Sequence, residues 1–289
     1  FGLDTLLSSS GSVTLNFTDK SITDLSYSIS GKTFVAKYDS YNIVNYTTFY
    51  NSTKNTYQKA YIIDETGTSY KLGTTKSSGK IKVSATTGNN IFISQSKKNN
   101  TITTSTGNDI IYTLGGNDTI TYSGGKDYYF SLSGNDYYKV NSFTENAYLS
   151  ITDSNSDNDK IYINTQNDNI RLFFNVKTDG TSASIEDDYS LYLVNKDIID
   201  YSEILSEETT GFIKINEYFG EGKIETMMSN EDILDIDVSV ETLAGEVAQW
   251  MIDNVDCSIY ETAFDIINNK VDGYEDLIAI YSNAQWNEA

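Results

Sequence analysis

Residues 104–139 hold four copies of a nine-residue unit with no gap between them: TSTGNDIIY (104–112), TLGGNDTIT (113–121), YSGGKDYYF (122–130) and SLSGNDYYK (131–139). Each copy has Gly at its fourth position, Asp at its sixth and a large side chain at its eighth. Two degraded copies precede them, with Asn90 and Asn100 where the later copies have Asp. Self-similarity at a fixed period predicts a repeat architecture in this part of the chain.

The unit resembles the nonapeptide G-G-x-G-x-D-x-U-x, in which U is a large apolar residue, of the repeats-in-toxin (RTX), or hemolysin-type calcium-binding, family. The resemblance implies a parallel β-roll, in which six residues make a turn and three make a short strand. Two copies then complete one coil, and the strands stack about 4.8 Å apart. The side chains expected to fill the thin core are those at the U positions, namely Phe92, Ile102, Ile111, Ile120, Tyr129 and Tyr138.

Calcium is the expected cofactor, because a short strand and a thin core cannot offset the entropy lost when the turns become ordered. Turns two copies apart should stack, which places Asp109 over Asp127 on one edge of the roll and Asp118 over Asp136 on the other. Carboxylate and carbonyl oxygens would line each gap, and Ca²⁺ takes 6 to 8 oxygen ligands in a flexible geometry. We therefore predict two calcium sites, one at each Asp pair.

Two further sets of residues complete the predicted metal sites. The turn glycines permit the backbone to bend without a Cβ clash, and they are Gly107, Gly116, Gly125 and Gly134. Asn90 and Asn100 would supply a neutral amide oxygen in place of a carboxylate, at two weaker sites. The copies lack the paired Gly at positions one and two of the family pattern, which argues against tight or numerous sites. The alternative is a metal-free β-helix whose Asn and Asp side chains form turns and ladders.

A fainter echo of the repeat lies at residues 158–161 and 167–170, which keep an Asn-Asp-x-Ile core nine residues apart but lack the turn Gly. The roll could resume there after an insertion. The stretch from Asp153 to Asp159 also imitates the start of an EF-hand loop, yet it has no Gly at the sixth position and Asn164 where a bidentate Glu belongs. We expect an acidic, solvated turn; a separate ion site is the alternative.

Composition excludes several classes of function. The chain has 20 Lys and Arg against 41 Asp and Glu, a formal net charge of −21, so it should repel nucleic acid and anionic membranes. It contains no His, which rules out Ser-His-Asp triads and His-liganded zinc, and no hydrolase signature is present. No apolar run approaches the roughly 18 residues that a membrane span needs. We expect a chain that is not an enzyme and has no transmembrane segment.

Four segments can be separated by pattern, and together they predict a mainly β chain with a parallel β-roll and a small helical C-terminus. The expected segments are a β-rich N-terminal segment (1–80), the calcium-binding β-roll (81–175), a mixed β segment (176–238) and a helical C-terminal cap or secretion-signal-like region (239–289). In the last of these the apolar period changes from two to near 3.6. A short helix is expected over residues 274–283.

The family resemblance also implies a biological setting. Proteins with these repeats are typically exported by type I secretion machinery, which reads an uncleaved C-terminal signal, and they fold when they meet extracellular calcium. We therefore expect a secreted, extracellular chain that is the C-terminal part of a longer polypeptide, and association with the cell surface is a further expectation. Its expected role is a calcium-dependent folding and secretion module of a structural surface protein, such as a surface-layer subunit or adhesin. The alternative is a non-catalytic carrier of an enzyme or toxin that lies upstream.

The expected partners are calcium ions, the type I machinery and either further copies of the chain or a cell-surface glycan. The Tyr pairs 128/129 and 137/138 could stack against sugars. Strand propensity explains the same pairs more simply, since aromatic residues favour pleated sheets.

Overall fold

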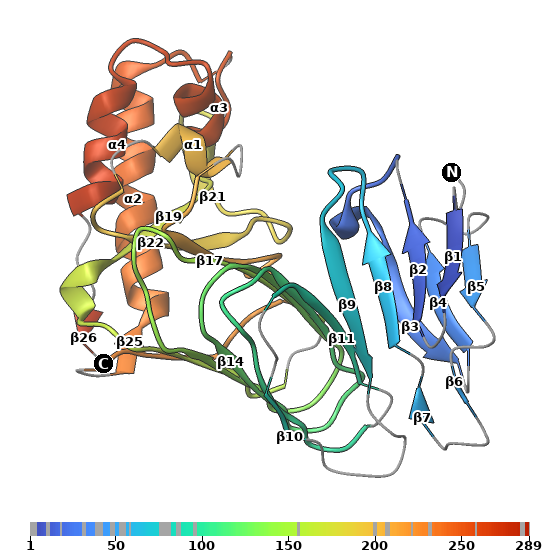
Figure 1. Ribbon diagram of the computed structural model, residues 1–289. Coiled ribbons are helices and arrows are strands. Elements are labelled where there is room, and N and C mark those ends of the chain that lie inside the picture. The colour runs from blue at the N-terminus through green and yellow to red at the C-terminus, as the bar shows by residue number, and fades with distance from the viewer. Residues whose placement is uncertain are drawn as a thin grey trace.

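The computed structural model describes the chain apart from residues 1–4, 10–11, 18, 31–32, 38–42, 47–49, 52–55, 58, 75–81, 85–87, 95–96, 155–156, 199–200, 206–208, 221, 231–232, 258, 284–286 and 289. A β-rich body, a β-roll and a partly helical body follow one another along the sequence (Figure 1). The N-terminal body lies at one end of the roll and the helices lie at the other. The prediction of a mainly β chain with a parallel β-roll and a small helical C-terminus is confirmed.

The N-terminal body is built from short strands with alternating apolar residues. Its elements are β1 (Thr5–Ser9), β2 (Ser12–Asn16), the 3-10 helix η1 (Ile22–Asp24), β3 (Ser26–Ser30), β4 (Thr33–Lys37), β5 (Ile43–Tyr46), β6 (Tyr50–Asn51), β7 (Thr56–Tyr57), β8 (Lys59–Ile63) and β9 (Ser69–Thr74). Strands β3, β4 and β5 form an antiparallel sheet of their own. Leu15 and Ile62 from the β2–β8 side and Phe34 and Ala36 from β4 are fully buried in one core. Period-two alternation thus produces a two-layered body.

The roll consists of two parallel sheets, and successive strands alternate between them. Its strands are β9, β11 (Asn90–Ile93), β13 (Asp109–Tyr112), β15 (Lys126–Ser131), β17 (Tyr148–Asp153) and β23 (Phe212–Ile215) in one sheet, and β10 (Lys82–Ser84), β12 (Thr101–Thr103), β14 (Thr119–Tyr122), β16 (Tyr137–Val140), β18 (Lys160–Ile163) and β24 (Thr226–Met228) in the other. The register pairs residues two copies apart, as in Ile102 with Ile120 and Ile120 with Tyr138. Two copies therefore complete one coil, as predicted.

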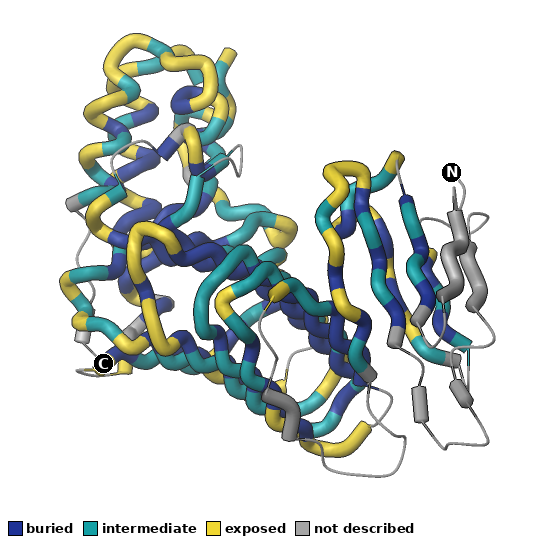
Figure 2. The backbone as a smooth tube through the Cα atoms, in the orientation of Figure 1, coloured by how far each residue is buried: buried dark blue, intermediate teal, exposed yellow. Residues whose placement is uncertain are grey.

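The interior of the roll is filled by the side chains at the eighth position of each copy. All six predicted core residues, from Phe92 to Tyr138, are buried in one apolar cluster. Figure 2 shows this buried zone as the dark strip that runs along the inside of the coil. Because Tyr129 and Tyr138 are inside it, these two rings are not available for stacking against a sugar.

The coil extends beyond residues 81–175 on both sides. On the N-terminal side β9 pairs in parallel with β11, and on the C-terminal side β23 and β24 continue the two sheets. Of the two fainter copies, Asn158-Asp159 leads directly into β18 and the roll does resume there. Asn167–Asn169 instead forms the 3-10 helix η2 and leads into β19 (Ile170–Phe174), which pairs antiparallel with β22 (Leu191–Asn195), so this copy has left the coil.

The C-terminal body packs on the last strands of the roll. Its remaining elements are β20 (Lys177–Thr178), β21 (Ala183–Ser184), α1 (Tyr201–Leu205), β25 (Ile233–Asp235), α2 (Ile236–Asn254), α3 (Ala263–Asn268), α4 (Tyr274–Asn283) and β26 (Asn287–Glu288). Helix α4 matches the predicted 274–283, and α2 begins three residues before residue 239. None of the helices described here has the length and apolar character needed to cross a membrane.

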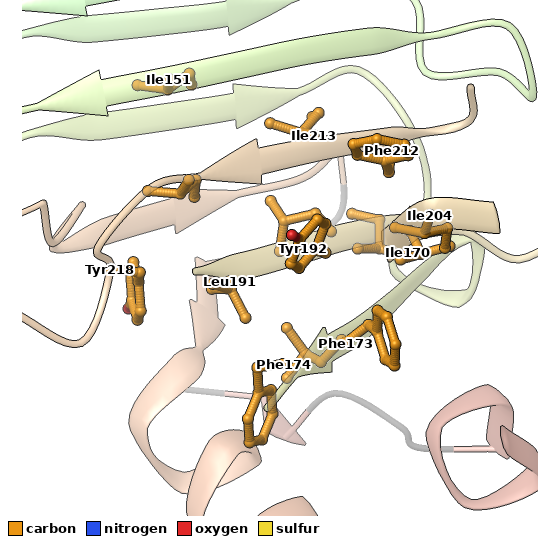
Figure 3. Packing of buried hydrophobic residues seen from close by; sticks show 14 of the residues in the cluster. Ile151, Ile170, Phe173, Phe174, Leu191, Tyr192, Ile204, Phe212, Ile213 and Tyr218 are labelled. Carbon is orange, nitrogen blue, oxygen red and sulfur yellow. The ribbon is translucent and has the colours of Figure 1, made fainter. Parts of the chain in front are cut away.

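An aromatic cluster joins these helices to the sheet. The ring centroid of Phe173 in β19 lies 4.8 Å from each of three others, those of Tyr201 in α1, Phe264 in α3 and Tyr281 in α4. Figure 3 shows Tyr192 between Phe173 of β19 and Phe212 of β23, and its ring centroid is 5.8 Å from that of Phe173 and 5.7 Å from that of Phe212. The core of the roll and the core of the C-terminal body are therefore one continuous apolar cluster.

Candidate metal centre

The carboxylates predicted from the repeat stand where each turn runs into a strand, and the backbone links them into two ladders. We call Asn90, Asp109 and Asp127 the short ladder, and Asn100, Asp118, Asp136, Asp159 and Glu225 the long ladder. In both, the backbone N–H of one member donates to the side-chain oxygen of the next. A carboxylate that accepts in this way fixes the spacing of successive turns.

The hydrogen bonds of the ladders are short. In the short ladder the N–H groups of Asn90 and Asp109 lie 2.8 and 2.9 Å from the Oδ1 atoms of Asp109 and Asp127. In the long ladder the Asp118 N–H lies 2.7 Å from Asp136 Oδ1, and the Asp136 N–H lies 2.6 Å from Asp159 Oδ1. Both predicted pairs, 109 with 127 and 118 with 136, are thus brought together by the fold. Their role as calcium ligands stays a prediction.

These carboxylates are buried, which raises the cost of their charge. Burial, with the charge of Asp109 as the next cause, raises the pKa of Asp127 to about 8. Burial likewise raises the pKa of Asp136 to about 7 and that of Asp118 to about 6, against the hydrogen bonds that they accept. Desolvation disfavours an ionised carboxylate unless an opposite charge compensates it. The ladders are therefore suited to a hard cation.

A buried oxygen of Asp118 supports the same fit. Asp118 Oδ2 accepts no hydrogen bond within the described part of the chain, although Asp118 is only 1% exposed. Burying a polar atom without a partner costs free energy, and a bound ion would remove that cost. Where Ca²⁺ binds at Asp118 and Asp136, it would supply charge compensation for both carboxylates, which hold the turns in register.

The two Asn residues at the ends of the ladders contact the next rung through their amide nitrogens. The Asn90 Nδ2 group lies 2.7 Å from Asp109 Oδ1 and 2.6 Å from the Gly88 carbonyl oxygen. The Asn100 Nδ2 group lies 2.8 Å from Asp118 Oδ1 and also donates to the Lys98 carbonyl oxygen. Both partners can only accept, so the amide nitrogen must face them. The amide nitrogens thus bridge to the next rung, whereas Asn100 Oδ1 is buried and accepts no hydrogen bond within the described part of the chain. A ligand role for the two amide oxygens stays a prediction.

The turn glycines are required by the stacking as much as by the bend. A Cβ on Gly116 would lie 2.6 Å from the carbonyl carbon of Lys98, in the turn one coil earlier. Gly125 has a φ of +94°, and a Cβ there would collide with the carbonyl oxygen of Gly107. Gly107, Gly116, Gly125 and Gly134 thus let successive turns approach closely enough for the ladders to form.

Three acidic residues of this region were not among the predicted ligands. Asp159 belongs to the fainter copy, and the Asn-Asp-x-Ile pattern was the signal that could have identified it. Glu225 precedes β24 directly and accepts the Asp159 N–H at 2.7 Å, without any repeat pattern around it. Asp153 ends β17 and is 3% exposed, so the expected solvated turn is wrong for both Asp153 and Asp159.

Comparison with known families agrees with this geometry. Residues 97–129 match the RTX calcium-binding nonapeptide repeat, in 4 copies. Residues 97–129 are RTX repeats. No curated protein matches the chain as a whole. The RTX repeats bind calcium, so Ca²⁺ is the cofactor of this segment, and RTX repeats fit a secreted calcium-binding protein. The coil extends beyond the matched RTX residues, since Asp136 and Asp159 continue the long ladder after residue 129.

Proposed function

We propose that the chain is a calcium-dependent folding and secretion module of an exported structural surface protein, of the surface-layer or adhesin type. The observation that carries the proposal is the pair of ladders, in which buried carboxylates stack along a thin coil. Such a coil is stable only when its charges are compensated. Calcium therefore decides whether the roll is folded.

Linkage explains how this property would serve export. A ligand that binds only the folded state stabilises it in proportion to the logarithm of ligand concentration over Kd. At the low calcium of a cytosol the roll would stay unfolded and could pass through type I machinery. In a calcium-rich space outside the cell it would fold. A non-catalytic role is part of the proposal, supported by the absence of His from the whole sequence.

A calcium titration of the full chain tests the folding role. We expect far-UV circular dichroism to gain β-structure as calcium rises, with no equal response to magnesium. Asp118→Ala combined with Asp136→Ala removes these oxygens without adding an amide donor, and it should move the midpoint to at least about 10-fold higher calcium, since removing groups that support a metal typically costs that much affinity. Asp168→Ala changes an exposed carboxylate outside both ladders and is the matched control. A calcium-free chain with full native β-structure would contradict the proposal.

A second experiment separates a structural protein from a carrier. Purified chain is brought to millimolar calcium and followed by light scattering and electron microscopy. Calcium-dependent sheets or fibres support the surface role. A persistent monomer favours the alternative, a non-catalytic carrier whose active part lies upstream.

A further inference from the structure

A column of small hydroxyl side chains runs along the roll opposite the long ladder. It consists of Ser94, Thr113 and Ser131, which end or follow β11, β13 and β15, and all three are buried. Thr113 and Ser131 are in contact in this column, with their hydroxyl oxygens 3.0 Å apart. We call this set the hydroxyl column.

Members of the hydroxyl column bond to the long ladder. The Ser131 hydroxyl donates to Asp136 Oδ2, and Ser94 Oγ accepts from the Asn100 amide at 3.3 Å. A hydroxyl can donate or accept, so it satisfies either kind of partner. The column therefore gives buried side chains of the long ladder a neutral partner on the same coil.

The next position in the column is occupied by a carboxylate, Asp153, and not by a hydroxyl. The register of β15 and β17 places Asp153 beside Ser131, and Asp153 faces Asp159 where the earlier coils have a hydroxyl facing the ladder. Carboxylate oxygens of Asp136, Asp153 and Asp159 all lie within 4.8 Å of one another. Asp153 thus places a second carboxylate where the preceding coil has the Ser131 hydroxyl, which donates a hydrogen bond to the ladder.

The three carboxylates, which we call the acidic trio, have few ways to be neutralised. Their exposed fractions are 1% for Asp136, 3% for Asp153 and 0% for Asp159. The Tyr138 hydroxyl donates to Asp153 Oδ2 at 2.7 Å, but Asp159 Oδ2 accepts no hydrogen bond in the described chain. A buried carboxylate that has one oxygen without a partner and lies beside two other carboxylates is the arrangement that a cation completes.

Electrostatics around Asp159 support the same conclusion. Burial raises the pKa of Asp159 to about 8, and the charges of Asp153, Asp136 and Glu225 raise it further. The backbone N–H of Asp136 opposes this shift only in part. Oxygen-only ligands of this charge suit a hard divalent ion, and calcium tolerates their irregular placement better than magnesium does.

We infer that Asp136, Asp153 and Asp159 hold a calcium ion of their own, at the end of the roll where it meets the C-terminal body. The site differs from the turn sites of the repeats because it uses a strand carboxylate, Asp153, that the earlier coils lack. Asp153 and Asp159 also lie outside the matched residues 97–129. Since the Asp159 N–H donates to Glu225 at the start of β24, the ion ties the RTX coil to the strands on which the C-terminal body packs. The inference needs only calcium binding and does not rest on export.

The test is Asp153→Ser in the full chain, because Ser restores the hydroxyl that Ser131 provides one coil earlier. Bound calcium is counted by mass spectrometry after gel filtration and by isothermal titration calorimetry. We expect the variant to bind one calcium fewer per chain than the parent. Asp168→Ser makes the same change at an exposed carboxylate and should leave the calcium count unchanged.

A calcium count equal to that of the parent would overturn the inference. If Asp153→Ser does not fold, Asp159→Asn is measured in its place, with the same loss of one calcium as the supporting result and an unchanged count as the contrary one. The outcome also separates this site from the proposed function. A variant that loses one calcium or none still folds in calcium through its turn sites, whereas a parent chain that binds no calcium would overturn both.

Discussion

At the scale of the residue, the difference between Asn and Asp decides where a ladder needs an ion. An Asn amide brings its own donor, as Asn100 does against Asp118 Oδ1 and the Lys98 carbonyl. An Asp at the same place is acceptor-only when ionised, so it adds a charge and removes a donor. The ladders therefore begin with a metal-independent rung and continue with rungs that need a cation.

We predict that Asn100→Asp makes the chain more dependent on calcium. The variant loses the amide donors to Asp118 and Lys98 and puts two buried carboxylates in contact, which should cost about 1–3 kcal/mol without calcium. Calcium titrations followed by far-UV circular dichroism measure the effect, and the midpoint of folding should move to higher calcium. Asn99→Asp is the control, because Asn99 is exposed and uses its side-chain oxygen as an acceptor, which Asp retains. Equal behaviour of the two variants would contradict this role of the amide.

We also predict that acid partly replaces calcium. Burial raises the pKa of Asp127 and Asp159 to about 8 and that of Asp136 to about 7, against about 3.9 for an unfolded Asp. Between about pH 4 and 8 the folded, calcium-free chain then holds more protons than the unfolded chain, so its stability falls as pH rises. Far-UV circular dichroism in EDTA should therefore show more β-structure at pH 5 than at pH 8. The chain has no His to produce a trend in this range.

Calcium at saturation should weaken that pH trend, because the ion displaces the same protons. A calcium-free chain with as much β-structure at pH 8 as at pH 5 would show that protonation of these carboxylates does not replace calcium.

Single residues also mark the limit of what the sequence could predict. The spacing of Asp109, Asp118, Asp127 and Asp136 was enough to place four side chains in two pairs, because a period of nine fixes which turns stack. Asp153 carries no such period, and its position opposite Asp159 depends on an insertion between β16 and β17. Only the register of the strands brings it into the trio.

At the scale of the element, successive turns of the coil pack backbone against backbone at their glycines. Gly88 and Gly125 occupy the same position in their copies and have φ values of +96° and +94°. A Cβ on Gly88 meets no described atom within 4 Å, whereas one on Gly125 collides with the Gly107 carbonyl of the turn below. The two glycines thus share one conformation and differ only in stacking.

We therefore predict that Gly125→Ala destabilises the calcium-bound chain more than Gly88→Ala does. Both variants should lose about 1–2 kcal/mol from the positive φ. Gly125→Ala should lose a further 1–3 kcal/mol or so, because the turns must move apart. Denaturant melts in calcium measure the two losses, and equal losses would show that stacking does not constrain the turn.

Strands of the roll were predictable only where the repeat persists. In the copies from Asn90 to Tyr138 the apolar eighth position predicts a strand, and each of these side chains is buried as expected. Strands β23 and β24 have no repeat around them, and Glu225 follows Asp159 in its ladder only after an excursion of 66 residues. Their place in the coil comes from packing against β17 and β18, which local sequence does not reveal.

At the scale of the whole molecule, two cores divide the chain unequally. One core runs from Phe92 through the roll to Tyr281 of α4 without interruption. The other belongs to the N-terminal body and includes Ile91, Ile93 and Ile110 from the outer face of the roll, with Tyr112, Tyr128 and Phe130 packed against it. Apolar contacts are what make a region unfold as a unit. The helical end thus depends on the calcium-bound coil, and the N-terminal body depends on it much less.

Hydrogen exchange read by mass spectrometry should resolve this division. In calcium, we expect protection in strands β11 to β18, in α2 and α4, and in β2, β8 and β9. On transfer to EDTA, protection should be lost together in the roll and in α2 and α4, because they share one core, while β2 and β8 should keep a larger part of theirs. A parallel sample in magnesium controls for ionic strength and should resemble EDTA, since the carboxylates are placed for a larger ion. Helices that stay protected after the roll has exchanged would show that the C-terminal body is stable by itself, and would break the link between calcium and the helical end.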